Sequence, residues 1–187
     1  MGKVIAAINM TLDGFCDHTA GIADAELHDH YTELLHGAGT LLYGRITYQL
    51  MESYWPLLVQ NPSGEVDMDE FAKAIDRVPK IVFSRTLQHL NWDSATLATQ
   101  SPAEVVQALK LQGGNDIFIG SPSLIAALTQ LQLIDEYQLC IHPVILGSGL
   151  PLFRGIQERM VLRLLHSKTL GSGAVVHTYA REGAEVE

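Results

Sequence analysis

The chain has 187 residues, enough for one domain with its own core, and its 47% hydrophobic and 18% charged residues are typical of a folded protein rather than a disordered one. A formal net charge of −9 and only twelve scattered lysines and arginines exclude the basic stripe that nucleic-acid binding requires. An anionic ligand would have to be held by local groups, namely helix N-termini, backbone amides and one or two arginines.

The first half of the chain alternates apolar runs with helical patterns. In chain order these predict a strand at 4–8, a helix at 23–36, a strand at 40–43, a helix from 44–45 to about 53, one short helix within a long connection over 55–79, and a strand at 80–83. A strand followed by a helix, repeated in this way, favours an α/β layer fold.

The second half begins in the same way and then changes character. It predicts a short strand near 95–98, a helix opened by a capping box at Ser101 and reaching about 111, a strand at 116–119, a helix over about 124–131, and strands at 136–145, 161–169 and 174–179. Gly171-Ser172-Gly173 is a hairpin signal between the last two strands. We therefore expect a mostly parallel sheet of about eight strands with an antiparallel C-terminal edge, and about four helices.

The termini and the cysteines bear on location and domain organisation. The apolar N-terminus is too short for a signal peptide, and no apolar stretch approaches membrane-spanning length. Cys16 and Cys140 lie far apart and in no metal-binding spacing, which favours reduced thiols. We expect a cytoplasmic protein with one domain over 1–181 and an acidic tail over 182–187.

Three predicted strands end in small residues, with a helix expected after each. These turns are Gly44-Arg45, Ser84-Arg85 and Gly120-Ser121. Ligands of open α/β sheets bind beyond the carboxyl ends of the strands, where helix N-termini offer free N–H groups to phosphates. Any one turn alone is explained at least as well as an ordinary cap, but three in one small domain favour a phosphate-binding edge.

The residues around these turns resemble the dihydrofolate reductase superfamily. The family's Gly-Arg-x-Thr-Tyr/Trp element is resembled by Gly44-Arg45-Ile46-Thr47-Tyr48, and its phosphate turn by Ser84-Arg85-Thr86. Its Gly-Gly-x-x-Leu/Ile turn is resembled by Gly120-Ser121-Pro122-Ser123-Leu124. Three further stretches resemble the reductase domain of riboflavin biosynthesis, namely 11–15, 133–137 and 143–153. The similarity spans about residues 3–181 and implies a three-layer dihydrofolate-reductase-like fold.

What the resemblance implies is NADPH binding across the strand ends. Gly44, Arg45 and Thr47 would hold phosphates, and Ser84 and Arg85 would face the adenosine 2′-phosphate. The pyrophosphate would be wrapped by the third turn, which comprises Gly120, Ser121, Pro122, Ser123 and Leu124.

The substrate would be a heterocycle or a ribosylamino group near Asp13 and the 23–36 helix. Asp13 follows the first strand and is our candidate catalytic acid, with an ordinary Asp-Gly turn as the alternative. Asp24 and His28 border the apolar stripe of that helix, so they could bind substrate or lie on a solvated flank.

The chain departs from the family in three places. Ser121 replaces the second turn glycine, no zinc-deaminase signature is present, and the substrate-binding carboxylate of the folate reductases has no match by motif. We therefore expect the chain not to be the bifunctional riboflavin enzyme.

Other kinds of site find less support. The stretch 147–152 lacks the third glycine of a dinucleotide fingerprint and is interpreted as a loop at the pocket rim. The histidines of the 23–36 helix are not spaced i, i+4, so we expect no metal. Asp67, Asp69 and Glu70 lack the glycine and distal glutamate of a calcium loop and instead favour the N-terminus of the next helix.

The sequence therefore predicts an NADPH-dependent reductase of a pterin-like or ribosylamino-pyrimidine-like substrate, similar to 5-amino-6-(5-phosphoribosylamino)uracil reductase or to dihydrofolate reductase. The alternative is a nucleotide- or drug-binding module on the same fold, without turnover. Apolar C-terminal strands, and the dimers common among such relatives, favour a homodimer. We expect no nucleic-acid or membrane partner.

Overall fold

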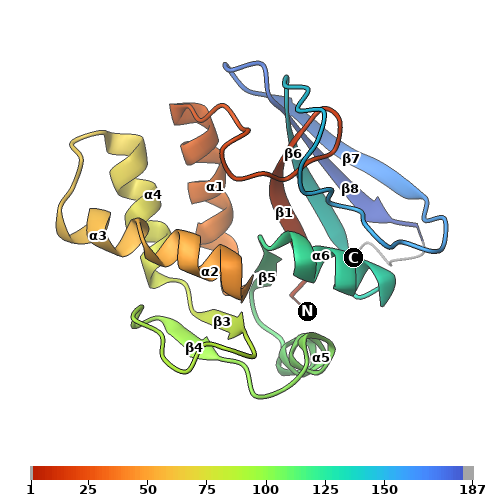
Figure 1. Ribbon diagram of the computed structural model, residues 1–187, viewed down its shortest axis with the longest axis horizontal. Helices are drawn as coiled ribbons and strands as arrows, with labels where there is room; N and C mark the ends of the chain where they lie inside the picture. The colour runs from red at the N-terminus through yellow and green to blue at the C-terminus, as the bar shows by residue number, and fades with distance from the viewer. Residues whose placement is uncertain (1, 183–187) are drawn as a thin grey trace.

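A computed structural model describes residues 2–182, so the predicted tail over 182–187 lies outside the described residues except for Glu182. Eight strands form one sheet (Figure 1): β1 (Val4–Thr11), β2 (Ala38–Gly44), β3 (Lys80–Phe83), β4 (Ala95–Leu97), β5 (Asp116–Ile119), β6 (Glu136–His142), β7 (Leu162–Thr169) and β8 (Val175–Arg181). Their order is β4-β3-β2-β5-β1-β6-β8-β7. The strands from β4 to β6 pair in parallel, and β8 runs antiparallel to both neighbours, which confirms the predicted mixed sheet.

The described residues contain six helices: α1 (Ala25–Gly37), α2 (Arg45–Glu52), α3 (Trp55–Gln60), α4 (Val66–Arg77), α5 (Pro102–Gln112) and α6 (Pro122–Gln130). This is more than the four or so expected. The sequence indicated helices in five segments, and the connection over 55–79, where one short helix was predicted, forms both α3 and the twelve-residue α4. The break between them is a turn in which Asp69 accepts hydrogen bonds from the amides of Ser63 and Gly64. Asp67 and Asp69 lie in the first turn of α4, as predicted.

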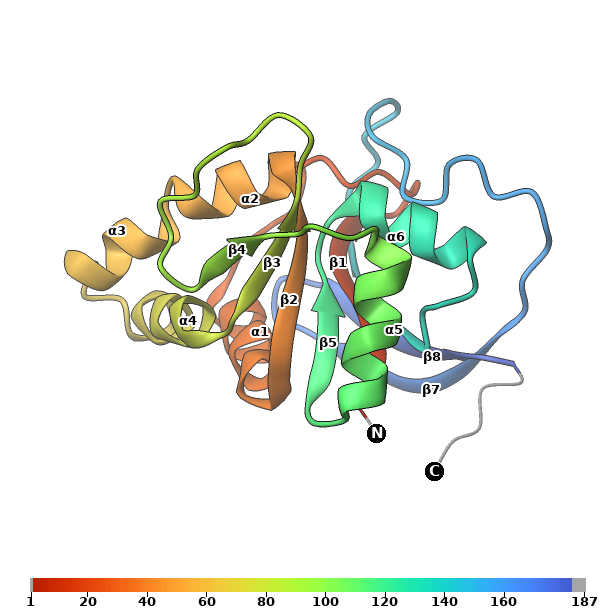
Figure 2. The ribbon, with the colours of Figure 1, turned by 90° about the horizontal axis from the view of Figure 1, so that it is seen from below.

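The molecule has three layers because successive residues of the central strand face opposite sides of the sheet. Val4, Ala6 and Ile8 of β1 pack with apolar residues of α5 and α6, whereas Ile5 packs with those of α1 and α4. Figure 2 shows these two helix pairs on opposite sides of β2 and β5. Among residues 2–182, no helix combines the length and the apolar character needed to cross a membrane.

The carboxyl ends of the six parallel strands meet at one edge of the sheet. The register places Gly44 of β2 opposite Phe83 of β3, and Thr11 of β1 opposite His142 of β6. Two predicted boundaries shift here: β1 continues past residue 8 to Thr11, and β6 ends at His142 rather than at residue 145. Pro143 follows and cannot donate to the ladder, so the strand stops there.

Candidate active site

A cavity of about 460 Å³ opens at this edge, between α1, α2 and the ends of β1, β2 and β5. Most of its wall is apolar, including Phe15, Leu27, Leu50, Trp55, Phe71 and Phe118. Cys16 belongs to this wall, and burial raises the pKa of its thiol to about 12, so the group is neutral. Both cysteines are free thiols, as expected. An apolar cavity with a few polar groups has the composition of a small-molecule site.

One hydrogen bond joins the turns after β2 and β5. The amide of Gly44 donates to Ser121 Oγ at 2.8 Å, and Ser121 is only 1% exposed. This contact explains the serine at the second turn position: its hydroxyl reaches across to the other turn instead of capping α6. A Cβ at position 44 would lie 3.3 Å from Ser123 Oγ, so the close approach of the turns favours glycine there.

The two helices that start at these turns have free N-termini. Neither α2 nor α6 has a side-chain cap or an acidic residue in its first turn. By contrast, Asp24 caps α1, and Ser101 and Glu104 form the predicted capping box of α5. Arg45, the first residue of α2, is exposed, and its guanidinium donates to Gln49. These free amides and this cation can receive an anion.

Some of the predicted cofactor residues line the cavity, whereas one has its side chain in the core. Those that line the cavity are Thr47, Gly120 and Pro122. The side chain of Leu124 is buried in the core between the sheet and α5 and α6, so only its backbone remains available to a ligand.

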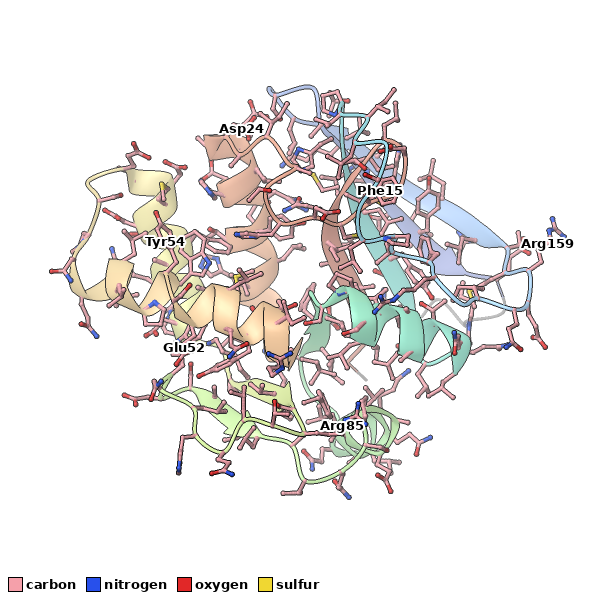
Figure 3. All side chains as sticks on the ribbon, viewed as in Figure 1. Phe15, Asp24, Glu52, Tyr54, Arg85 and Arg159 are labelled. Atoms are coloured by element: carbon pink, nitrogen blue, oxygen red, sulfur yellow. The ribbon has the colours of Figure 1, made fainter. Side chains whose placement is uncertain are left out.

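The turn after β3 differs from the prediction because no helix follows this strand. Ser84 Oγ instead accepts from the amides of Thr86 and Leu87, and an irregular segment leads to β4. Arg85 is exposed, and neither it nor Ser84 lines the cavity. Figure 3 shows Asp24 near the top and Arg85 near the bottom of the molecule in this view. Ser84 nevertheless comes directly after Phe83, which pairs with Gly44, the residue that precedes α2.

Asp13 holds a loop. Its carboxylate accepts from Thr11 Oγ1 and from the amides of Leu146 and Gly147. These hydrogen bonds, led by that from Thr11, lower the pKa of Asp13 to about 2. The carboxylate does not line the cavity, and a group ionised at neutral pH is a poor proton donor. These contacts therefore favour the turn-forming alternative for Asp13.

The glycine-rich stretch lies at the cavity rim, as predicted. Leu150 lines the cavity, and its amide donates to Asp17 Oδ2 at 2.8 Å. Asp13 and Asp17 thus attach this loop to the segment between β1 and α1.

The two candidate substrate residues of the first helix have different surroundings. Asp24 precedes α1, accepts from the amides of Leu27 and Ser172, and does not line the cavity. His28 does line it, with Nδ1 2.7 Å from Asp67 Oδ2 and its ring edge-on to Trp55. The hydrogen bond from His28 lowers the pKa of Asp67. Of the two, His28 has the position of a functional group.

The sequence analysis missed a polar group in the cavity wall. Asn9 Oδ1 lies 3.1 Å from Tyr31 Oη and 3.2 Å from His142 Nε2, and all three residues line the cavity. The available signal was an asparagine near the carboxyl end of an otherwise apolar run, residues 4–10. Tyr31 and His142 come from α1 and the end of β6, so no local pattern joins them.

The sheet order, the layers and the cavity at the strand ends define a dihydrofolate-reductase-like α/β fold. The chain belongs to the family described as the RibD C-terminal domain, whose model matches residues 2–176. This is the reductase-domain family of riboflavin biosynthesis.

Similar proteins span nearly the whole chain. It is 34% identical over 185 residues to the uncharacterized protein YyaP of Bacillus subtilis (strain 168), covering 97% of this chain and 96% of that one. A putative riboflavin biosynthesis protein from Shewanella sp. PV-4 superposes with a TM-score of 0.71 at 21% identity, over 97% of this chain and 99% of that one. A diaminohydroxyphosphoribosylaminopyrimidine deaminase/5-amino-6-(5-phosphoribosylamino)uracil reductase from Thermotoga maritima gives 0.65 at 16% identity, over 96% of this chain and 56% of that one.

Proposed function

We propose that the protein is an NADPH-dependent reductase of a small heterocyclic substrate, pyrimidine-like or pterin-like. One observation carries the proposal: the uncapped N-termini of α2 and α6 are joined by the Gly44–Ser121 hydrogen bond beside a mainly apolar cavity. A dinucleotide needs this combination, since its phosphates require N–H groups and positive charge, and its nicotinamide requires a dry pocket.

The chain's own residues fit such a cofactor. Arg45, Thr47 and the free amides at the starts of α2 and α6 would hold phosphates, while Gly120 leaves the backbone open where β5 ends. Ser84 and Arg85 follow the strand next to β2, where they would meet the 2′-phosphate that distinguishes NADPH from NADH. When bound, the cofactor supplies hydride.

Reduction of a C=N or C=O bond also requires a proton on the heteroatom, and we assign this task to His28. Asp67 is hydrogen-bonded to Nδ1, which orients the ring and leaves Nε2 as the other proton-carrying nitrogen. An imidazole is the side chain that enzymes most often use as a general acid. The protein's part in the reaction is thus to bind, to orient and to protonate.

The cofactor assignment is tested by titrating the protein with NADPH and following its fluorescence. We expect Arg45→Ala and Arg85→Ala each to weaken NADPH binding about tenfold, because each removes a charge-assisted phosphate contact. The thermal midpoint should stay within about 2 °C of the parent, since both side chains are exposed. Arg85→Ala should leave NADH binding unchanged.

Arg159→Ala is the matched control, because it removes one exposed arginine far from α2 (Figure 3). Parent-like NADPH affinity in both variants would show that the cofactor does not bind at these turns. Turnover is then sought by following NADPH absorbance across a panel of pyrimidines and pterins. Binding of NADPH without oxidation of any panel member would instead favour the non-catalytic module.

A further inference from the structure

We propose that Asn9 determines the ligand specificity of the cavity, because its side-chain N–H, next to the Tyr31 hydroxyl, is arranged to receive an amide edge: a carbonyl oxygen beside an N–H. This inference deepens the proposed function by naming the chemical group that the cavity recognises. The inference about Asn9 requires that the cavity binds a ligand, but it does not require that the protein catalyses hydride transfer.

The orientation of the Asn9 carboxamide follows from His142. The amide of Ile22 donates to His142 Nδ1 at 3.0 Å, so that nitrogen carries no proton. His142 is 1% exposed, and burial lowers its pKa, so the ring is neutral with its single proton on Nε2. The loop packs closely on this ring: a Cβ on Gly21 would lie 3.2 Å from Nε2. The tautomer is therefore set by the main chain.

Two donors then meet at Asn9 Oδ1. His142 Nε2–H lies 3.2 Å away and Tyr31 Oη 3.1 Å away. Burial raises the pKa of Tyr31 well above its usual value, so its hydroxyl keeps the proton that it donates. Both lone pairs of Oδ1 are thus used, which leaves the Nδ2 group as the free end of the carboxamide.

The free end of Asn9 is available to a ligand. Asn9 is exposed and lines the cavity, and no acceptor for Nδ2 occurs among residues 2–182. The Tyr31 proton is committed to Asn9, so the remaining capacity of its oxygen is to accept. A donor on Asn9 and an acceptor on Tyr31, whose oxygen lies 3.1 Å from Asn9 Oδ1, therefore belong to the lining of a mainly apolar cavity.

This pair complements an amide edge. A ring lactam, as in a pyrimidinone, presents a carbonyl oxygen to Nδ2 and an N–H to the Tyr31 oxygen, and so does a primary carboxamide. A group that offers only N–H donors, such as an amidinium, would leave Nδ2 facing another donor. A polar group that a bound ligand shields from water and leaves unpaired is costly, and such mismatches reduce affinity by about tenfold to a hundredfold.

The test compares two flat probes, 2-pyridone, which has an amide edge, and benzamidine, which has only donors. Binding is measured from the thermal midpoint in every protein and, where Asn9 is present, also from its side-chain amide resonances. We expect the parent to bind 2-pyridone at least tenfold more tightly than benzamidine.

Asn9→Asp replaces the donor by an acceptor of the same shape, and its preference should reverse. Asn61→Asp adds the same charge on an exposed residue outside the cavity, and its preference should match that of the parent.

A second measurement needs no variant, which matters if Asn9→Asp fails to fold. Nitrogen-15 correlation spectra of the parent should show His142 protonated at Nε2 and not at Nδ1. The opposite tautomer would reverse the carboxamide and overturn the inference. So would a parent that binds benzamidine as tightly as 2-pyridone.

The amide edge could belong to the substrate or to the carboxamide of the nicotinamide ring. With NADPH at saturation, continued binding of 2-pyridone assigns the edge to the substrate, whereas displacement together with a shift of the Asn9 resonances assigns it to the cofactor. Either result supports the recognised chemistry. If the protein binds no NADPH, the probe comparison still stands, so failure of the proposed function and failure of this inference are distinguishable.

Discussion

The hydrogen-bond partners of Asp13 and His28 make His28, rather than Asp13, the better candidate for the proton donor. The sequence favoured Asp13 as the acid because it follows a strand, yet its carboxylate is occupied by Thr11 and by a loop 133 residues away. His28 was one of two flank residues of a helix, and its partner Asp67 lies 39 residues later on α4. Periodicity could place a side chain near the cavity but could not identify what it contacts.

At the residue scale, we expect His28→Gln to lower kcat about a hundredfold on any substrate found in the panel, because glutamine cannot supply a proton. NADPH affinity should not change. Asp67→Asn should lower kcat about tenfold and alter its pH profile, since the orienting carboxylate is lost. His36→Gln, at the exposed end of the same helix, is the control. A parent-like kcat for His28→Gln would mean that the proton comes from another group.

At the element scale, one buried lysine connects α4 to β3. Lys80 is 1% exposed, and its Nζ donates to the carbonyls of Ile75 and Val78 and to Ser94 Oγ. The ring of Trp92 lies 4.0 Å from the same nitrogen. The strand at 80–83 was predicted correctly, but a lysine in its first position gave no indication that it would satisfy the end of a twelve-residue helix.

Lys80→Met should lower the free energy of unfolding by about 3 kcal/mol, because it leaves buried carbonyl groups without a donor. Burial lowers the pKa of Lys80 to about 8, below the ordinary 10.5 of the unfolded chain. The charged form is therefore disfavoured in the fold, and the parent gains stability relative to the variant as pH rises from about 8 to 10.5.

Urea denaturation measures both effects. Lys73→Met, on the exposed face of α4 beside Glu70, should change the unfolding free energy by less than about 0.5 kcal/mol. Equal losses in the two variants would contradict the assigned role of Lys80.

At the scale of the whole molecule, β7 leaves the sheet open. It is the last strand in the order, and Leu164 and Leu165 are 51% and 37% exposed. An edge strand presents unpaired backbone groups and is a template for pairing with another chain. We therefore propose that the homodimer expected from the sequence forms through this edge.

Light scattering should give the mass of a dimer for the parent and of a monomer for Leu164→Glu, because a charge on β7 opposes close pairing. Leu111→Glu changes an 88% exposed leucine at the end of α5, and this variant should remain a dimer. A parent of monomer mass, or a Leu164→Glu variant that remains dimeric, would contradict pairing through β7.

The sequence by itself determined the class of fold, most strands, the cap of α5 and the turns after β2 and β5. These depend on side-chain period, on capping chemistry and on motifs, all of which act over a few residues. Only the tertiary structure decided that the turn after β3 starts no helix, that α3 and α4 are separate, and that Asn9, Tyr31 and His142 form one polar group. Those outcomes depend on contacts between residues as many as 133 positions apart, which exist only once the sheet has brought the strand ends together.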